Sequence, residues 1–397
     1  MKIAILFDTY LNNRKGLFNA IINRIKNLMA VADSCTIDLF CLQAQPAGLN
    51  KLLIKRHTQV YANSIQTDGL TINIVWYKHY LIDDILTNRF HKPSFMFKKW
   101  VKKNIASFSS YDIITAHSAR CGEMARNINK KYGIPYFVTW HGTDIHTTPF
   151  CSPSLRQYVT KILNGAACNF FVSNALMKTA QIFTRGFKAE VLYNGVSEDF
   201  KTYDGTTKKS IREKYGLRNE KVVAFVGNVI PVKNVSLLPE IYSEVKRKYC
   251  EKVSFWIIGD GSQRVLVEKG MKEKNVDCVF WGNMPLDEMP NMMNCIDVLV
   301  LPSKKESFGL VLVEAIACGA NAVGSRVGGI PEVIGEENTF ELKYGFVTNI
   351  SDRIVYFLTN NFKQVVKNKF SWKETAIKEY DIYNQVCLNY EKVVLQN

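Results

Sequence analysis

Two glutamates stand out in the stretch SKKESFGLVLVEA, which runs from residue 303 to residue 315. Glu306 and Glu314 lie eight positions apart, around a glycine and a run of apolar residues. The pattern SFGLVLVEAIACGA predicts a helix that begins at Glu306 or Ser307 and ends near Gly319. Eight residues of helix span about 12 Å, farther than the roughly 5 to 9.5 Å between paired glycosidase carboxylates. The spacing therefore favours two contacts on one extended ligand over an acid/base pair acting on one bond.

The start of this predicted helix is a second feature that could bind a ligand. Backbone N–H groups near Phe308, Gly309 and Leu310 would be exposed there and would face a phosphate group. A purely structural alternative stays equally open on geometry alone. In that case Glu306 would cap a buried helix, and Glu314 would pair with a lysine.

Lys233 and His141 each follow an apolar run and could also take part in chemistry. Lys233, in VGNVIPVKN, could stabilise charge on a leaving phosphate, although a lysine in such a turn is ordinarily a solvated surface residue. His141, in TWHGTD, should emerge at the carboxyl edge of a sheet, where ligands of doubly wound folds bind. A lone histidine after a strand is more often structural, and His117 in YDIITAH is interpreted as a packed residue.

The elements that must position these side chains are short apolar runs that alternate with helix-like segments. Runs that are apolar throughout suit parallel strands buried on both faces. The pattern therefore predicts an α/β protein with two doubly wound domains. The runs in the first half are KIAILF, TIDLFCL, TINIVW, YDIITAH, PYFVTW and NFFVS, and those in the second half are KVVAFVG, VSFWIIG, DCVFWG, DVLVLPS, ANAVGS and GFVTN.

The domain boundary is expected in a polar segment. Residues 200–217, FKTYDGTTKKSIREKYGL, are the best candidate for a linker and restart. The N-terminal domain is therefore expected over 1–200 and the C-terminal domain over 201–371. The last stretch, SWKETAIKEYDIYNQVCLNYEKVV, has a helical period and a serine cap, which predicts a terminal helix over 372–397.

Composition narrows the class of protein. A chain of 397 residues, 47% hydrophobic and 22% charged, is typical of a globular protein with two domains. No apolar run approaches the roughly 18 residues of a membrane span, and the opening MKIAILFD is interpreted as a first strand rather than a signal peptide. None of the ten cysteines forms a CxxC pair or a metal-ligand cluster, which favours buried thiols in a reducing cytoplasm.

The formal net charge of +15 is concentrated in the first half. Residues 1–200 contain 24 Lys and Arg against 12 Asp and Glu. A nucleic-acid-binding protein would explain such a charge, but no recognised module is present, so specific nucleic-acid binding is not expected. An NAD-dependent dehydrogenase would share the α/β pattern, but the G-x-G-x-x-G fingerprint is missing from the first turn and from IIGDGSQR.

The motifs together resemble those of a known family. ESFGLVLVEA, preceded by DVLVLPS and followed by GSRVGGIPEVI, resembles the donor-site signature of the retaining nucleotide-sugar glycosyltransferases of family 4. The order of YDIITAH, TWHGTD, YNGV, VGNVIPVKN, IIGDG and FWGNMPLDEM along the chain is similar too. The resemblance implies the GT-B fold, in which two Rossmann-like α/β domains face a central cleft and a C-terminal helix returns to the N-terminal domain.

The resemblance implies roles for residues of the second half. Glu314 would bind the donor ribose hydroxyls, Lys233 the pyrophosphate, and Glu306 would act as a catalytic residue beside the transferred sugar. Asn228 departs from the family, because many members carry an arginine there as a second phosphate cation. The other residues expected to bind the donor are Met284, Ser307, Phe308, Gly309 and Leu310.

In the first half, the resemblance implies that His141 is a catalytic contact to the transferred sugar. The loop DTYLNNRKGLFNA resembles the glycine loop that shapes the acceptor site, with one glycine where relatives often have two. Lys15 and Gly16 are therefore expected to bind a phosphate on the acceptor. No DxD-type metal signature stands in a donor motif, so we expect no metal and no cofactor besides the nucleotide-sugar donor, UDP-linked rather than GDP-linked.

A basic segment of the first half, FHKPSFMFKKWVKKNI at 90–105, could contact a membrane. It places Phe97, Trp100 and Val101 near one helical face with four lysines beside them. Such a segment could lie on an anionic bilayer, or it could be a surface helix whose apolar face packs in the core. The +12 balance of the first half favours the membrane and a cytoplasmic protein at the inner face of the cell membrane.

The family resemblance implies a retaining hexosyl- or N-acetylhexosaminyl-transferase. It would move a sugar from a nucleotide diphosphate to a hydroxyl of an oligosaccharide acceptor, lipid-linked in the expected case, in bacterial capsule, O-antigen or exopolysaccharide assembly. The alternative is a catalytically idle homologue that acts as an assembly partner, which the asparagine at 228 keeps open.

Overall fold

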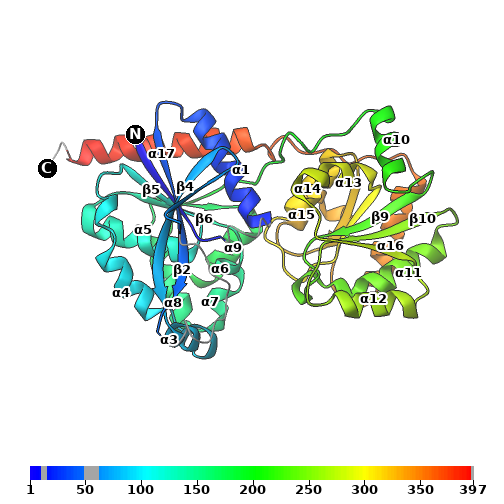
Figure 1. Ribbon diagram of the computed structural model, residues 1–397, viewed down its shortest axis with the longest axis horizontal. Coiled ribbons are helices and arrows are strands. Elements are labelled where there is room, and N and C mark those ends of the chain that lie inside the picture. Colours follow the sequence, from blue (N-terminus) through cyan, green and yellow to red (C-terminus); the bar gives the residue numbers. More distant parts are fainter. Residues whose placement is uncertain (10–15, 49–61, 395–397) are drawn as a thin grey trace. The chain divides into compact units, whose positions relative to one another are not determined.

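The chain divides into two compact units. A computed structural model describes residues 1–9, 16–48 and 62–394. Unit 1 comprises Met1–Tyr193 together with Trp372–Asn397, and unit 2 comprises Asn194–Ser371 (Figure 1). The chain first passes from one unit to the other at Tyr193–Asn194, a few residues before the boundary predicted at residue 200.

Unit 1 is built on an eight-stranded sheet. Its strand order is β3-β4-β2-β1-β5-β6-β7-β8, and every neighbouring pair is parallel except the β3–β4 hairpin. The six apolar runs predicted in the first half all form strands. The strands are β1 (Lys2–Phe7), β2 (Thr36–Pro46), β3 (Ser64–Thr67), β4 (Leu70–His79), β5 (Ile113–Ala116), β6 (Tyr136–Trp140), β7 (Cys168–Phe171) and β8 (Ala189–Val191).

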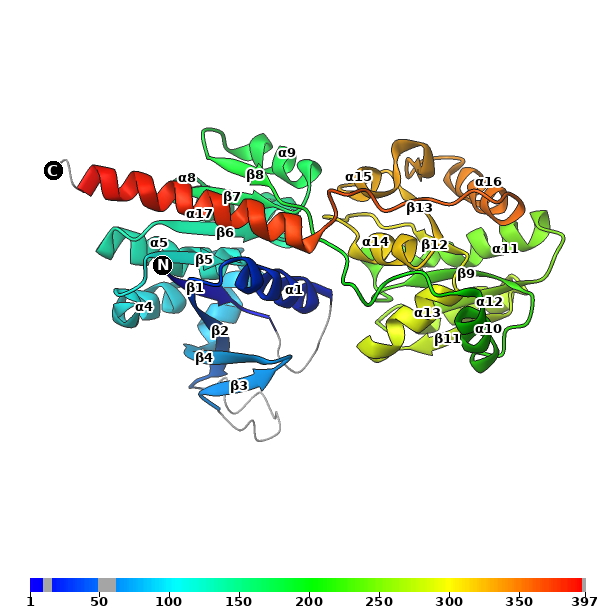
Figure 2. The same cartoon turned by 90° about the horizontal axis from the view of Figure 1, so that it is seen from above.

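Helices cover both faces of this sheet. Helices α1 (Gly16–Val31) and α17 (Trp372–Val394) pack against each other on one face, as Figure 2 shows. Helices α4 (Phe95–Lys103), α5 (Ala119–Tyr132) and α8 (Pro153–Gly165) cover the other face (Figure 1). The remaining helical segments of unit 1 are α3 (Leu81–Asp84), the π-helical turn η1 (Ile85–Arg89), η2 (Ala106–Phe108), α6 (Thr143–His146), α7 (Thr148–Cys151) and α9 (Asn174–Phe183).

The predicted C-terminal helix is part of the core of unit 1. Tyr383 of α17 is fully buried and lies against the rings of Phe137 and Phe170 on the sheet. Beside it, the buried Nε of Arg24 on α1 donates to Glu379 of α17 at 2.7 Å, and the Tyr383 hydroxyl lies 2.6 Å from the same carboxylate. The last helix therefore completes the domain that the first strand begins.

Unit 2 is built on a six-stranded sheet that is parallel throughout. Its order is β11-β10-β9-β12-β13-β14. Five of the six apolar runs predicted in the second half form strands. The strands are β9 (Lys221–Val226), β10 (Val253–Ile258), β11 (Cys278–Gly282), β12 (Val298–Leu301), β13 (Asn321–Ser325) and β14 (Thr339–Phe340).

The sixth run, GFVTN at 345–349, was wrongly predicted as a strand. It begins helix α16, because Gly345 takes a left-handed conformation at the helix N-terminus, and apolar residues then recur at helical spacing. Residues 205–214 of the expected linker likewise form a helix, α10. The helical segments of unit 2 are α10 (Gly205–Lys214), η3 (Pro231–Lys233), η4 (Val235–Leu237), α11 (Leu238–Lys248), α12 (Arg264–Glu273), η5 (Leu286–Glu288), α13 (Met289–Cys295), α14 (Leu310–Ala317), α15 (Ile330–Ile334), η6 (Glu336–Asn338) and α16 (Phe346–Thr359).

The strand order of each sheet creates a point where ligands of this architecture bind. In unit 2 the chain proceeds outward from β9 in one direction through β10 and β11, and in the other through β12, β13 and β14. The loops that follow β9 and β12 therefore leave the sheet toward opposite faces, which opens a crevice at the carboxyl ends of these strands. In unit 1 the corresponding switch lies between β1 and β5.

Candidate functional site

An ion pair joins the two loops at the switch point of unit 2. Lys233 ends the short helix η3 after β9, and Glu306 lies in the loop after β12. The Lys233 Nζ lies 2.5 Å from the Glu306 Oε2, with 21% and 14% of the two side chains exposed. A backbone hydrogen bond from the Lys304 N–H to the Val232 carbonyl, 2.8 Å long, holds the loops together beside the pair. The structure thus brings together two predicted site residues that lie 73 positions apart in the sequence.

Glycines let two loops of unit 2 pack backbone to backbone. Gly259, after β10, lies so close to the carbonyl of Gly227, after β9, that a Cβ there would overlap it, and Gly261 lies equally close to the Val229 carbonyl. The Val229 N–H donates to the Asp260 carbonyl at 3.0 Å. These contacts fix the backbone of the segment that carries Lys233.

Helix α14 begins later than predicted. Its first residue is Leu310, and Gly309 precedes it with a φ of +88°, so neither Glu306 nor Ser307 lies in the helix. Because the left-handed turn at Gly309 is costly for other residues, the extended loop ends and the helix begins there. The estimate of about 12 Å between the two glutamates assumed a continuous helix, so it does not apply.

Two further glycines, in the motif GSRVGGIPEVI, support the loop that holds Glu306. Gly328 has a φ of +52°, and a Cβ on it would overlap the Glu306 carbonyl oxygen. The N–H of Gly329 donates to that same carbonyl at 3.2 Å, and a Cβ on Gly329 would overlap the Ser307 carbonyl. This pair of glycines was not among the predicted site residues, although the GG dipeptide was a signal for it.

Glu314 lies on α14 without a bonding partner in the part of the chain that the structure describes. It is half-buried, and burial raises the pKa of its carboxyl to about 7. The alternative in which a lysine neutralises Glu314 finds no support among these residues, and Glu306 caps no helix. A carboxylate held in this way can accept hydrogen bonds from a ligand diol.

The other expected donor-binding residues lie on loops after β9, β11 and β12. Asn228, after β9, is half-buried. Met284 follows β11, two strands away from β9, and is half-buried as well. The Phe308 ring is 2% exposed and packs edge-on against Phe370, so only the Phe308 backbone can face a ligand. Ser307, Gly309 and Leu310 lead into the N-terminus of α14.

In unit 1 the structure brings together two histidines that the sequence presented separately. His117 follows β5, His141 follows β6, and the Nδ1 of His117 lies 3.1 Å from the Nε2 of His141. The rings stack with centroids 5.4 Å apart. Burial and the nearby Arg24 guanidinium lower the pKa of His141 to about 3, and burial together with His141 and Arg24 lowers the pKa of His117 well below its usual value. Both rings are therefore neutral near pH 7.

His117 is buried, as its sequence context indicated, and its contact with His141 also orients the His141 ring. The adjacent loop is held by Asp144, which accepts a hydrogen bond from the Ala119 N–H at 2.9 Å. Of the two predicted acceptor residues, Gly16 begins α1 with open space around its Cα. Lys15 lies outside the described residues.

The described residues, 1–9, 16–48 and 62–394, show neither a metal cluster nor a membrane-spanning helix. No group of three or more His, Cys, Asp or Glu side chains within those ranges is placed to hold a metal ion. No helix there combines the length and hydropathy needed to cross a bilayer.

Comparison with known proteins agrees with this architecture. Residues 207–378 match the family model described as glycosyl transferases group 1, and residues 62–200 match the model described as glycosyltransferase family 4. The two matches together span well over half of the chain. The chain belongs to glycosyltransferase family 4. The family predicted from the motifs is confirmed, and so is the assignment as a transferase.

Relatives of this family-4 glycosyltransferase include two bacterial proteins named as a synthase and a mannosyltransferase. It is 28% identical over 298 residues to the N-acetyl-alpha-D-glucosaminyl L-malate synthase of Bacillus anthracis, which covers 73% of this chain and 76% of that protein. It is 25% identical over 214 residues to the serotype-specific mannosyltransferase WbdA of Escherichia coli, which covers 50% of this chain and 26% of that protein.

Solved structures show the same fold. The structure of HepE from Anabaena in complex with UDP matches with a TM-score of 0.69 at 17% identity, over 99% of this chain and all of that chain. The predicted GT-B fold is thereby confirmed. Within the fold, this family-4 glycosyltransferase presents a cation, an adjacent carboxylate and a helix N-terminus at one switch point, an arrangement suited to a phosphorylated ligand.

Proposed function

We propose that this family-4 glycosyltransferase transfers a sugar from a UDP-sugar, with retention at the anomeric carbon, to a hydroxyl of a lipid-linked glycan in bacterial surface polysaccharide assembly. The observation that carries the proposal is the Lys233–Glu306 pair at the switch point of unit 2. In a nucleotide sugar the phosphate adjoins the transferred sugar. A cation that binds the phosphate, beside a carboxylate that binds the sugar, suits that substrate.

The proposed roles follow from the chemistry of each group. Lys233 and the backbone N–H groups at the start of α14 would stabilise the charge that develops on the leaving diphosphate. Glu306 would accept hydrogen bonds from sugar hydroxyls and stabilise positive charge at the anomeric carbon. Glu314 would accept the ribose hydroxyls, and Met284 would lie toward the base. His141, kept neutral and oriented by His117, would hydrogen-bond the sugar.

Asn228 adds a neutral donor where many family members have a cation. Diphosphate stabilisation would then depend on Lys233 and the helix N-terminus, which we propose are sufficient without a divalent metal. Transfer should therefore persist in a chelator. Loss of transfer in the chelator, with recovery on adding one divalent metal, would contradict this proposal.

The UDP preference is supported by the solved relative, whose structure contains UDP. The proposed setting in surface polysaccharide assembly is supported by the serotype-specific mannosyltransferase among the relatives. A peripheral contact with an anionic inner membrane is also proposed. The apolar face of α4 was expected to make that contact, but it packs inside unit 1, where Phe97 and Val101 are buried. Other residues must therefore make it.

A thermal-shift screen against UDP, GDP, ADP and their sugar conjugates tests the donor assignment. A ligand at about 100 times its dissociation constant stabilises a fold by roughly 2.7 kcal/mol, which is readily measured. We expect a shift with UDP and its conjugates, and its loss in Glu314→Ala. Absence of a shift with every nucleotide would instead indicate an idle homologue and point to Asn228 as the cause.

A further inference from the structure

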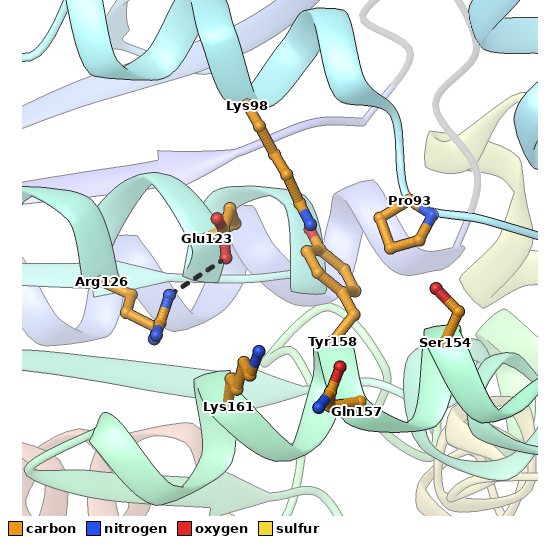
Figure 3. A pocket seen from close by; sticks show the side chains of 8 residues that line it. All are labelled: Pro93, Lys98, Glu123, Arg126, Ser154, Gln157, Tyr158 and Lys161. Carbon is orange, nitrogen blue, oxygen red and sulfur yellow. Dashed lines mark ion pairs between the residues drawn. The ribbon is translucent and has the colours of Figure 1, made fainter.

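A cavity of about 160 Å³ lies in unit 1 among helices α4, α5 and α8. It is smaller than the roughly 300 to 1,000 Å³ of sites that enclose a drug-sized ligand, but it is large enough for a single phosphate group. These three helices cover the sheet face opposite to α1 and α17, so the cavity is separate from the strand-end loops described above. Figure 3 shows its lining, which consists of Pro93, Lys98, Glu123, Arg126, Ser154, Gln157, Tyr158 and Lys161.

The cavity carries an excess of positive charge. Its single carboxylate, Glu123, is 7% exposed and lies 3.7 Å from the Arg126 guanidinium. Lys98 and Lys161 have no carboxylate within ion-pair distance in the part of the chain that the structure describes. One carboxylate therefore offsets one of three cations, and two positive charges remain for an anionic ligand.

The lining is built for hydrogen bonding as well as charge. Ser154, Gln157, Tyr158 and Lys161 recur at spacings of three and four along one side of α8. The Tyr158 hydroxyl donates to the Ala119 carbonyl at 3.0 Å, and the Lys98 Nζ lies 5.2 Å from the centre of the Tyr158 ring. Lys98 thus reaches from α4 to a side chain that α5 holds in place (Figure 3).

Exposed apolar side chains occur in the segment that leads into the cavity. Ile82, Ile85, Phe90 and Phe95 are 54%, 43%, 55% and 63% exposed, and they lie within residues 82–95, a stretch that ends at the first residue of the basic helix α4. Large apolar side chains beside lysines are typical of surfaces that insert into the headgroup region of an anionic bilayer. A free phosphate ion would need no such apolar neighbours.

From these observations we infer that the cavity among α4, α5 and α8 binds the phosphate of an anionic phospholipid headgroup while the neighbouring apolar side chains enter the bilayer. This inference deepens the proposed transfer to a lipid-linked acceptor, on which it rests for the source of the phosphate. Lys98, Arg126 and Lys161 neutralise the phosphate, and the Ser154 and Gln157 side chains hydrogen-bond its oxygens.

The test is co-sedimentation of the full chain with vesicles at 0.15 M salt, where charges farther apart than about 8 Å are largely screened. One set of vesicles contains phosphatidylglycerol and phosphatidylcholine in equal parts, and the other contains phosphatidylcholine alone. The pocket variant is Lys98→Gln/Lys161→Gln. The matched control is Lys102→Gln/Lys103→Gln, which removes the same charge from exposed positions of α4 outside the cavity.

We expect the wild-type protein to bind only the phosphatidylglycerol vesicles, and the pocket variant to bind them at least tenfold more weakly than the control variant. Each basic residue near an anionic surface contributes about fivefold through general attraction. Equal losses in the two variants would therefore reveal diffuse attraction and overturn the pocket. Phe95→Ser should weaken vesicle binding in the otherwise unchanged protein.

Calorimetry with inorganic phosphate alone separates the two sources of phosphate. Binding of inorganic phosphate at Lys98 and Lys161 without any vesicle partition would overturn the lipid assignment. The UDP thermal shift, measured without vesicles, keeps this test distinct from the donor proposal. A pocket variant that keeps the UDP shift and loses vesicle binding supports the inference, and failure of the UDP shift in wild type affects only the donor proposal.

Discussion

At the scale of single residues, the Lys233–Glu306 pair is the feature on which the chemistry depends. Both side chains are mostly shielded from water, so their charges act through a lower dielectric than on the open surface. Proximity alone assigns no role to either Lys233 or Glu306. The pair indicates a binding site because it lies where the strand order reverses, and because three glycine-rich loops fix the backbone around it.

Replacing the lysine should therefore affect the reaction more than the fold. Lys233→Met should lower kcat by about 100- to 1,000-fold, the usual cost of removing one fixed group that stabilises transition-state charge. Lys304→Met is the matched control, because Lys304 is exposed and contributes only its backbone N–H to the loop. Steady-state kinetics would measure kcat for both variants. A decrease in kcat of less than threefold in Lys233→Met would show that this lysine has no role in the mechanism.

Glu314 should make nucleotide binding depend on pH. Its pKa of about 7 means that the carboxyl is mostly neutral at pH 6 and mostly ionised at pH 8. Since the ionised form accepts both ribose hydroxyls, the dissociation constant for UDP should fall about tenfold between pH 6 and pH 8. Glu314→Gln should remove this part of the pH dependence, which titration calorimetry would measure. An unchanged profile in the variant would exclude Glu314 as its source.

The raised pKa of Glu314 should also make the stability of the nucleotide-free protein depend on pH. Because the folded pKa is raised, the neutral carboxyl contributes its full stabilisation below the unfolded pKa near 4.5 and loses it as the pH rises through about 7. The advantage of Glu314→Gln in melting temperature should accordingly be larger at pH 8 than at pH 5.

At the scale of elements, two glycines of the GG dipeptide decide where the glutamate loop can lie. Gly328→Ala would push a methyl group into the Glu306 carbonyl, so we expect loss of both transfer and the UDP thermal shift. Gly345→Ala is a fair control, since Gly345 has a φ of +83° and a Cβ there would meet only Asn349 Nδ2, at an ordinary contact distance of 3.8 Å. It should cost about 1 to 2 kcal/mol for the left-handed conformation alone and leave transfer intact. Equal behaviour of the two variants would contradict the packing argument.

Breaking the buried ion pair between α1 and α17 should lower the free energy of unfolding, whereas replacing both partners with apolar residues should change it little. Glu379→Leu leaves the Arg24 guanidinium buried without its carboxylate, which should lower the free energy of unfolding by about 3 to 5 kcal/mol. The double variant Arg24→Met/Glu379→Leu should recover most of that loss. Urea unfolding followed by near-ultraviolet circular dichroism would measure both, and no recovery in the double variant would refute this account.

The elements also show how far sequence reasoning reaches. Continuous apolar runs identified eleven strands, because burial on both faces imposes that pattern. The prediction for GFVTN was wrong because five apolar and polar residues fit either a strand or the first turn of a helix, and the left-handed conformation of Gly345, its first residue, places the helix start there. The predicted start of α14 was wrong for a similar reason, because Gly309 takes a left-handed conformation and the helix begins only after it. The contact of His117 with His141 depends on the alignment of β5 and β6, which local sequence does not encode.

At the scale of the whole molecule, every residue proposed to bind the nucleotide part of the donor lies in unit 2. The fragment 194–371 has its own complete sheet and core, so we expect it to fold alone and to bind UDP within about threefold of the full chain. The fragment 1–193 lacks α17, which supplies Tyr383 to its core, and should not reach a cooperative fold. Circular dichroism and calorimetry on both fragments would test this expectation. A fragment 1–193 that melts cooperatively would contradict it.

The position of α17 also sets an order of events during protein synthesis. Unit 2 leaves the ribosome with its whole core available, whereas the strands of unit 1 must wait until the last helix has been translated. At about 5 to 20 residues per second, the intervening chain takes on the order of 10 to 40 s to make. During that interval the faces of Phe137 and Phe170 that Tyr383 later covers are open to water. The nascent N-terminal half is therefore the part of this protein that most needs chaperone protection, even though it is made first.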